Sequence, residues 1–323
     1  MYGILPLQMR KNPIRGGTEM KTGIPFYKAE LIAEKSWMIS NGFVDRSYAL
    51  CYLVEGRDYA LLIDSILGFG NLKAFCETLT EKPVLLVNTH AHSDHFGGNF
   101  FFDACWMHHR DIAPFQNSVG KVKKQQLADM AKEMALEPYR DLIEPDDEFT
   151  DWHPMKVFPL YGGDVFDLGD RKIEVVEVGG HTAGSVVLID PAAGIAYSGD
   201  ACNGNTLLEF EDSLPVASYM KALLRLKEHQ GRFSKMYGGH EIFDSSIVDE
   251  AIETVGRVIA GTDDRVETAG ILGYPVCYAA RKVKDGYERE DGKHFNMSYL
   301  PGIILGPDRE AQAITLPREE NAP

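Results

Sequence analysis

The sequence lacks the cysteine pattern of a disulfide-bonded or cysteine-ligated protein. Its 323 residues contain no Cys-x-x-Cys pair and only an odd, scattered set of five cysteines: Cys51, Cys76, Cys105, Cys202 and Cys277. Scattered cysteines of this kind are typical of reduced thiols. We therefore expect neither a disulfide framework nor a structural zinc site built from cysteines, and we interpret Cys202 as a buried thiol rather than a metal ligand.

Long apolar runs and an excess of basic residues are also missing. No stretch reaches the roughly 20 apolar residues of a membrane-spanning helix, and the N-terminus lacks the apolar core of a secretory signal. The net charge of −15 disfavours a general attraction to nucleic acid or to an anionic membrane. We expect a cytoplasmic protein with a small-molecule substrate and no nucleic-acid or membrane partner. The sequence leaves the oligomeric state open, a homodimer included.

Short β-branched and apolar runs alternate with helical patterns along the chain. Strand-like runs lie at 48–56, 59–65, 83–89, 172–178, 185–190 and 195–199, and helical patterns lie at 71–80, 216–229 and 246–261. This order predicts an α/β or α+β protein with more than one sheet. A helical stretch at about 119–145 separates two strand-rich halves. It could be a solvated connection or a lid over a site.

One short segment concentrates metal-binding side chains. Residues 88–99 read NTHAHSDHFGGN and contain the spacing His-x-His-x-Asp-His. In an extended segment His90 and His92 point to the same side, so both imidazoles can reach one ion. If a helix begins near residue 93, Asp94 and His95 face another direction and can hold a second ion. The segment thus supplies two ligands for each of two metals and leaves both sets incomplete.

Three further ligand-type residues follow strands elsewhere in the chain. His181 and His240 each come after a strand and a pair of glycines, and Asp200 follows the strand at 195–199. Functional side chains of α/β proteins gather where strands end, so these loops can meet at one edge. Four other histidines do not fit this pattern, and we interpret them as surface or loop residues: His108, His109, His153 and His229.

These motifs, in this order, resemble the metallo-β-lactamase fold superfamily. The resemblance rests on eight residues: Asp64, His90, His92, Asp94, His95, His181, Asp200 and His240. It implies an α/β fold of the αββα four-layer type, with two mixed β-sheets and helices outside, formed by residues 1–323 as a single domain. In this domain the stretch at about 119–145 is a helical insertion, and the C-terminal segment 262–323 packs near the active site.

The resemblance also implies two divalent metal ions. Three histidines would bind one ion, an aspartate and two histidines would bind the other, and one aspartate would bridge them. These sets are His90, His92 and His181; Asp94, His95 and His240; and Asp200. Nitrogen and carboxylate ligands suit zinc, which we expect, and they also accept iron or manganese. Asp64 is expected to orient a ligand by hydrogen bonding.

A dinuclear site of this kind implies a metal-dependent hydrolase. A metal-bridging hydroxide would attack an ester-like bond of a small molecule, namely a thioester, lactone or carboxylic ester, while Asp94 both binds metal and transfers a proton. The spacing of the last three ligands resembles that of the glyoxalase II group, whose basic glutathione-binding pattern is missing here. Asn203 and His294 are expected to contact the substrate.

Two other functions stay open. A phosphodiesterase uses a similar dinuclear site, although the acidic charge and the lack of a basic binding stretch disfavour it. A sulfur dioxygenase with one iron uses a subset of the same ligands. Within the superfamily, the presence of Asp200 disfavours β-lactam hydrolysis, and Asn203 stands where acyl-homoserine lactonases have a tyrosine. The sequence does not identify the substrate.

Overall fold

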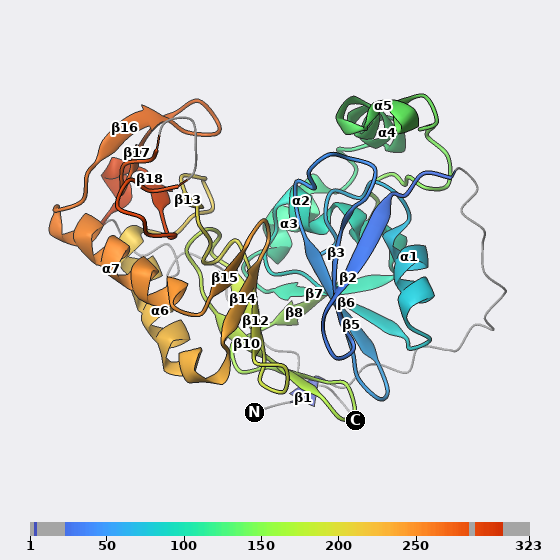
Figure 1. Cartoon of the computed structure of the whole chain (residues 1–323), viewed down its shortest axis with the longest axis horizontal. Coiled ribbons are helices and arrows are strands. Elements are labelled where there is room, and N and C mark those ends of the chain that lie inside the picture. The colour runs from blue at the N-terminus through green and yellow to red at the C-terminus, as the bar shows by residue number, and fades with distance from the viewer. Residues whose placement is uncertain (1–2, 5–22, 284–287, 306–323) are drawn as a thin grey trace.

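The fold consists of two large β-sheets packed face to face, with helices on both outer sides (Figure 1). The structure is a computed structural model that describes residues 3–4, 23–283 and 288–305. Predictions that concern the remaining residues, including part of the C-terminal segment 262–323, lie outside the described residues. The predicted α/β architecture of the αββα type is confirmed.

The first large sheet is built from the N-terminal half of the chain. Its strands stand in the order β2-β3-β4-β5-β6-β7-β8. Their bounds are Tyr27–Ala33, Ser36–Asn41, Cys51–Glu55, Ala60–Ile63, Val84–Val87, Ala104–His108 and Lys156–Leu160. Strands β2 to β5 pair antiparallel, whereas β5 to β8 run parallel. Because parallel strands end at the same edge of a sheet, the loops after β5, β6 and β7 emerge together.

The second large sheet is built mainly from the following part of the chain. Its strands stand in the order β1-β9-β10-β11-β12-β14-β15. Their bounds are Gly3–Ile4, Val165–Asp167, Lys172–Glu177, Val186–Asp190, Ile195–Gly199, Lys235–Gly238 and Ile242–Asp244. β12 and β14 run parallel, and β10 and β11 pair antiparallel. β11 also pairs antiparallel with β12, so β10, β12 and β14 run in the same direction and their C-terminal ends lie at one edge.

A small third sheet was not predicted from the sequence. It has the strand order β13-β18-β17-β16, with the bounds Thr206–Leu208, Met297–Tyr299, Pro275–Tyr278 and Val266–Ala269. β13 pairs parallel with β18, although the two are far apart in the chain. Strands this short carry little periodic signal, and their pairing depends on distant segments. The described part of the segment 262–323 is thereby joined to the loop that follows Asp200.

Helices form the two outer layers. Their bounds are α1 Leu72–Leu79, α2 Ser93–Phe96, α3 Ile112–Ser118, α4 Lys124–Met134, α5 Glu137–Arg140, α6 Val216–His229 and α7 Ile247–Ala260, with 3-10 turns at Gly97–Phe101, Gln230–Arg232 and Pro301–Ile303. α6 and α7 cover the second sheet, and α1 lies on the far side of the first (Figure 1). In the described residues no helix is long and apolar enough to cross a bilayer.

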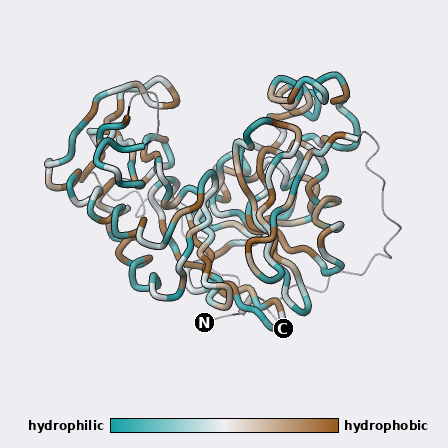
Figure 2. The backbone as a smooth tube through the Cα atoms, in the orientation of Figure 1, coloured by the Kyte–Doolittle hydropathy of each residue, from teal (hydrophilic) through white to brown (hydrophobic). Residues whose placement is uncertain are grey.

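Apolar side chains fill the spaces between these layers, and Figure 2 shows the apolar segments concentrated in the sheets. Successive residues of a strand point to opposite faces, so β5 contributes to two cores. Leu61 and Ile63 pack between the sheets, whereas Ala60 and Leu62 pack toward the helices on the outer face. The interior thus anchors the strands on both faces and fixes the edge from which the ligand loops emerge.

The helical stretch at about 119–145 forms α4 and α5, which lie at one end of the first sheet in Figure 1. On α4, Leu127, Ala128 and Ala131 are buried in the core that the first sheet shares with its helices. The Leu136 N–H donates a hydrogen bond of 3.0 Å to the Phe43 carbonyl. This stretch is therefore packed against the fold, and its role as a lid stays a prediction.

Candidate metal centre

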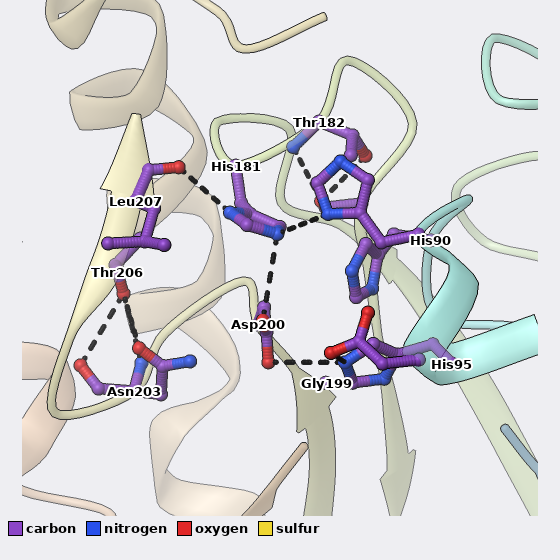
Figure 3. Close-up of polar contacts among 12 residues, drawn as sticks. His90, His95, His181, Thr182, Gly199, Asp200, Asn203, Thr206 and Leu207 are labelled. Carbon is purple, nitrogen blue, oxygen red and sulfur yellow. Dashed lines mark hydrogen bonds and ion pairs between the residues drawn. The ribbon is translucent and has the colours of Figure 1, made fainter. Parts of the chain in front are cut away.

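The seven predicted ligands come from loops that follow four strands. His90 and His92 follow β6, and Asp94 and His95 lie in the short helix α2 directly after them. His181 follows β10, Asp200 follows β12 and His240 follows β14. The structure brings these side chains to one edge between the two large sheets, where Figure 3 shows four of them side by side. The strand-end pattern in the sequence is thus matched by spatial convergence.

His90, His92 and His181 form the first half of the site, which we call the three-histidine half-site. One ring nitrogen of each lies within 4.8 Å of those of the others. His92 Nδ1 is 2.8 Å from His181 Nε2. Three imidazole nitrogens at this spacing are a donor set that suits zinc and neighbouring transition metals.

Asp94, His95 and His240 form the second half, which we call the aspartate half-site. The chain turns into α2 at Ser93, as the sequence predicted, and this turn separates Asp94 and His95 from the two preceding histidines. Asp94 Oδ2 lies 3.6 Å from both His95 Nε2 and His240 Nε2. This half-site offers one carboxylate oxygen and two imidazole nitrogens.

Asp200 lies between the two half-sites. Its Oδ2 is 3.6 Å from His181 Nε2 and 3.3 Å from His240 Nε2, whereas its Oδ1 is 3.6 Å from His95 Nε2. The carboxylate therefore faces ligands of both half-sites at once. Gly199 places it there with a positive φ of 48° and leaves no room for a side chain, because a Cβ would lie 2.1 Å from Thr89 Oγ1.

The outward nitrogens of the histidines are held by the protein. His90 Nδ1 is 3.1 Å from Thr89 Oγ1, and His95 Nδ1 is 3.0 Å from Asp64 Oδ2. His181 Nδ1 is 2.8 Å from the Leu207 carbonyl. Such contacts fix the ring orientation and aim the other nitrogen at a metal.

His240 is oriented in the same way, because its Nδ1 lies 2.6 Å from the Tyr48 carbonyl. Several inward-facing atoms, by contrast, lack hydrogen-bond partners: within the described part of the chain, His90 Nε2, His95 Nε2 and Asp200 Oδ1 are buried without any hydrogen bond. Buried polar atoms of a folded protein are normally satisfied. The residues present therefore fit two divalent cations, which would supply the missing partners.

Electrostatics favour a positive charge at the aspartate half-site. Burial lowers the pKa of His95, but the carboxylates of Asp94 and Asp200 outweigh it and raise that pKa to about 10. Burial lowers the pKa of His181 in the three-histidine half-site to about 4. A neutral imidazole is the form that binds a metal, so the carboxylates attract a cation while His181 stays available as a ligand.

Three other predicted site residues have definite positions. Asp64 is 1% exposed and contacts His95, as its predicted orienting role requires. Asn203 is buried, and its Oδ1 accepts hydrogen bonds from the Asn205 N–H and the Thr206 hydroxyl. His294 is exposed and binds Glu250 through its backbone N–H. Substrate contacts of Asn203 and His294 stay predictions.

Sequence reasoning missed two acidic residues beside the site. Asp212 Oδ2 lies 3.5 Å from His92 Nε2. Asp111 accepts hydrogen bonds from Ala91 and Thr182, next to three of the ligands. Asp111 follows β7, so predicting that strand would have placed it at the ligand edge. Asp212 lies in an acidic loop after β13, where no spacing marks its role.

Two aromatic side chains border the centre and were also missed. The Phe210 ring packs edge-on against His92 and His181, with centroids 4.9 and 5.5 Å away. Tyr48 packs edge-on against His240 at 5.4 Å, and half of its surface is exposed. The two rings therefore stand beside opposite halves of the site.

The interpretation of His108 as a surface or loop residue was wrong. It is the last residue of β7, is 1% exposed, and its Nε2 lies 3.0 Å from Glu177 Oε1. β7 lies between two parallel neighbours, so its residues are buried on both faces of the sheet. The buried position of Cys202, by contrast, agrees with its interpretation as a buried thiol.

Comparisons with known sequences agree with this geometry. The sequence model of the Metallo-beta-lactamase superfamily matches residues 44–266, a range that contains all seven candidate ligands and Asp64. The human acyl-coenzyme A thioesterase MBLAC2 is 27% identical over 221 residues, covering 63% of this chain and 77% of that protein. The chicken (Gallus gallus) acyl-coenzyme A thioesterase MBLAC2 is 26% identical over 215 residues, covering 63% and 76%.

A solved structure supports the fold assignment. A metallo-beta-lactamase from Erythrobacter litoralis superposes with a TM-score of 0.50 at 16% identity, covering 76% of this chain and 99% of that one. The superfamily model spans well over half of the sequence, so the match does not depend on the one conspicuous motif. The chain belongs to the metallo-beta-lactamase superfamily and is a hydrolase of that superfamily.

Proposed function

We propose that this protein is a dinuclear metal-dependent hydrolase that cleaves acyl thioesters of a small carrier such as coenzyme A. One observation supports the metal assignment: His90 Nε2, His95 Nε2 and Asp200 Oδ1 are buried and have no hydrogen-bond partner in the described structure. The choice of a thioester is supported by the relatives that are named acyl-coenzyme A thioesterases. Of the three predicted kinds of bond (thioester, lactone and carboxylic ester), the proposal thus selects the thioester.

In this reaction the protein's side chains would first hold and orient the metal ions. The three-histidine half-site would hold one cation, the aspartate half-site the other, and Asp200 would lie between them. When bound, two such cations would polarise the thioester carbonyl and lower the pKa of a water molecule. We propose zinc for both, because the nitrogen and carboxylate donors suit it.

Asp94 is the residue proposed to move a proton. Its side chain is 19% exposed, whereas that of His95 beside it is fully buried, so Asp94 can meet both solvent and substrate. Its carboxylate would accept a proton from the attacking water and deliver it to the sulfur as the carbon–sulfur bond breaks. The products are then a carboxylic acid and a free thiol.

Phe210 and Tyr48 are proposed to contact the apolar parts of the substrate. Both rings lie against ligand histidines, and Tyr48 is half exposed. Apolar contact with an acyl chain would hold the thioester over the site by removing apolar surface from water. Asn203 and His294 belong to the same proposal as polar contacts from the loop after Asp200 and from the C-terminal segment.

A substrate panel tests this proposal. The zinc-loaded protein is assayed for thiol release from short- and long-chain acyl-coenzyme A, and beside it with a lactone and with bis(4-nitrophenyl) phosphate. We expect the thioesters to be cleaved fastest, and we expect His90→Ala and Asp94→Asn to lose at least 100-fold in kcat/KM. Asp129→Asn is the matched control, because Asp129 is exposed on α4.

Two results would count against the proposal. Faster turnover of the phosphodiester than of any thioester would assign the site to the phosphodiesterase alternative. One iron per chain, together with oxygen consumption on a persulfide, would assign it to the sulfur dioxygenase alternative.

A further inference from the structure

Asp111 is a buried carboxylate outside the seven candidate ligands, and it joins two of the ligand loops. It is 1% exposed. Its Oδ2 accepts hydrogen bonds from the Ala91 N–H at 2.9 Å and from Thr182 Oγ1 at 2.8 Å, and its Oδ1 accepts one from the Gly184 N–H at 2.7 Å. One side chain therefore connects the loop after β6 with the loop after β10.

The place of Asp111 in the chain makes this use of the carboxylate unusual. Asp111 is the N-cap of α3, where an aspartate normally accepts hydrogen bonds from the first turn and stabilises the helix. In the described structure its side chain makes no such capping bond. Both carboxylate oxygens instead accept hydrogen bonds from the ligand loops. Asp111 therefore connects distant segments and does not cap its own helix.

The approach of the second loop to Asp111 is too close for a side chain. A Cβ added to Gly184 would lie 2.4 Å from Asp111 Oδ1, well inside contact distance. The glycine therefore lets the backbone after His181 reach the carboxylate. The distance between the two loops is set by three hydrogen bonds that share one buried side chain.

The residues held by Asp111 are neighbours of every ligand in the three-histidine half-site. Ala91 lies between His90 and His92, and Thr182 directly follows His181. We propose that Asp111 is a positioning residue that sets the spacing of the three-histidine half-site, so that its loss weakens metal binding there and spares the aspartate half-site. This inference rests on the proposed function only in requiring that the protein bind metal.

The test measures zinc affinity in two backgrounds by competition with a chromophoric chelator. His240→Ala disables the aspartate half-site, and His92→Ala disables the three-histidine half-site. An asparagine offers a single acceptor oxygen and turns its NH₂ toward N–H donors. We therefore expect Asp111→Asn to weaken zinc binding by about 10-fold or more in the His240→Ala background and by less than about twofold in the His92→Ala background.

Two further variants keep the test decisive. Thr182→Val removes one of the three hydrogen bonds and preserves the side-chain shape, so a smaller loss is expected in the same background even if Asp111→Asn fails to fold. Asp190→Asn is the matched control. Asp190 is fully buried, hydrogen-bonds Arg171, and lies at the opposite end of β11 from the ligand loops. It should lower thermal stability without changing zinc affinity.

The outcomes separate this inference from the proposed function. Equal losses in both backgrounds, or no loss in either, would overturn the positioning role of Asp111 while leaving a metal-binding parent protein intact. A parent protein that binds no zinc would overturn both proposals together.

Discussion

Asp64 and His95 are in direct contact beside the candidate metal centre, with Asp64 Oδ2 3.0 Å from His95 Nδ1 and both side chains buried. The same carboxylate accepts hydrogen bonds from the N–H and the hydroxyl of Thr89, at 2.7 and 2.8 Å. Through these hydrogen bonds, Asp64 connects the end of β5 with the His-x-His-x-Asp-His segment. It also leaves His95 Nε2 as the nitrogen that faces Asp94 and Asp200.

Replacing Asp64 tests this orienting role. Asp64→Asn keeps the shape but removes one acceptor oxygen and the charge, so His95 loses its fixed orientation. We expect the apparent affinity for zinc to fall by about 10- to 100-fold. Chelator competition measures the affinity, and circular dichroism checks that the variant is folded. A folded variant with unchanged zinc affinity would show that the contact is not needed to orient the ligand.

Gly239 offers a test of how tightly the ligands are packed. A Cβ at this position would lie 2.3 Å from His95 Cε1 and 2.6 Å from Asp200 Oδ1. Gly239→Ala must therefore displace two ligands, and we expect it to abolish binding of at least one of the two metal equivalents. Gly231→Ala is the control, because nothing lies within 4 Å of a Cβ there. Metal analysis after dialysis compares the two, and equal metal content would contradict the packing.

Phe210 should affect the substrate more than the metals. Phe210→Ala removes a ring that borders His92 and His181, and with it the proposed apolar contact to the acyl chain. We expect KM for long-chain acyl-coenzyme A to rise about 10-fold, roughly 1.4 kcal/mol, with metal content unchanged. Phe210→Leu keeps an apolar side chain and should recover most of the loss. A fall in metal content with unchanged KM would assign Phe210 to the metal site instead.

The lowered pKa of Glu177, which is not a candidate ligand, predicts a pH dependence of stability. Its hydrogen bond with His108, with a further one from the Gly162 N–H, outweighs partial burial and lowers the pKa of Glu177 from 4.5 to about 2. Because the folded-state pKa is depressed, this stabilisation is complete above about pH 4.5 and is lost as the pH falls toward 2.

Urea unfolding between pH 7 and pH 3 measures this contribution. The Glu177 side chain is 32% exposed, so solvent screening reduces the effect to roughly 1–2 kcal/mol. Glu177→Gln should be less stable at pH 7 and should lose less stability on acidification than the parent. Parallel pH curves for the two proteins would contradict the assignment.

Much of the candidate site could be predicted because each candidate ligand carries a local signal in the sequence. The strand Ile195–Gly199 and the helix Val216–His229 lie where periodicity placed them. Since Asp200 directly follows that strand, residue type and strand end together located it at the ligand edge. The same reasoning placed His181 and His240 in the site.

What the sequence did not predict depends on contacts between distant segments. β13 and β18 are three residues each and pair across about ninety positions, so neither shows a pattern of its own. In the sequence, Asp111 has the pattern of an ordinary helix cap. Only the folded chain shows that its oxygens accept hydrogen bonds from two distant loops. His108 reads as polar, yet its place in a strand between parallel neighbours buries it.

Metal content of the purified protein tests the central claim most directly. The chain is expressed in zinc-supplemented medium, dialysed against metal-free buffer, and its metals are quantified by elemental analysis beside His92→Ala and His240→Ala. A dinuclear site with two half-sites predicts two zinc ions per parent chain and one in each variant. A parent chain that retains no metal, or variants that retain as much as the parent, would contradict the account.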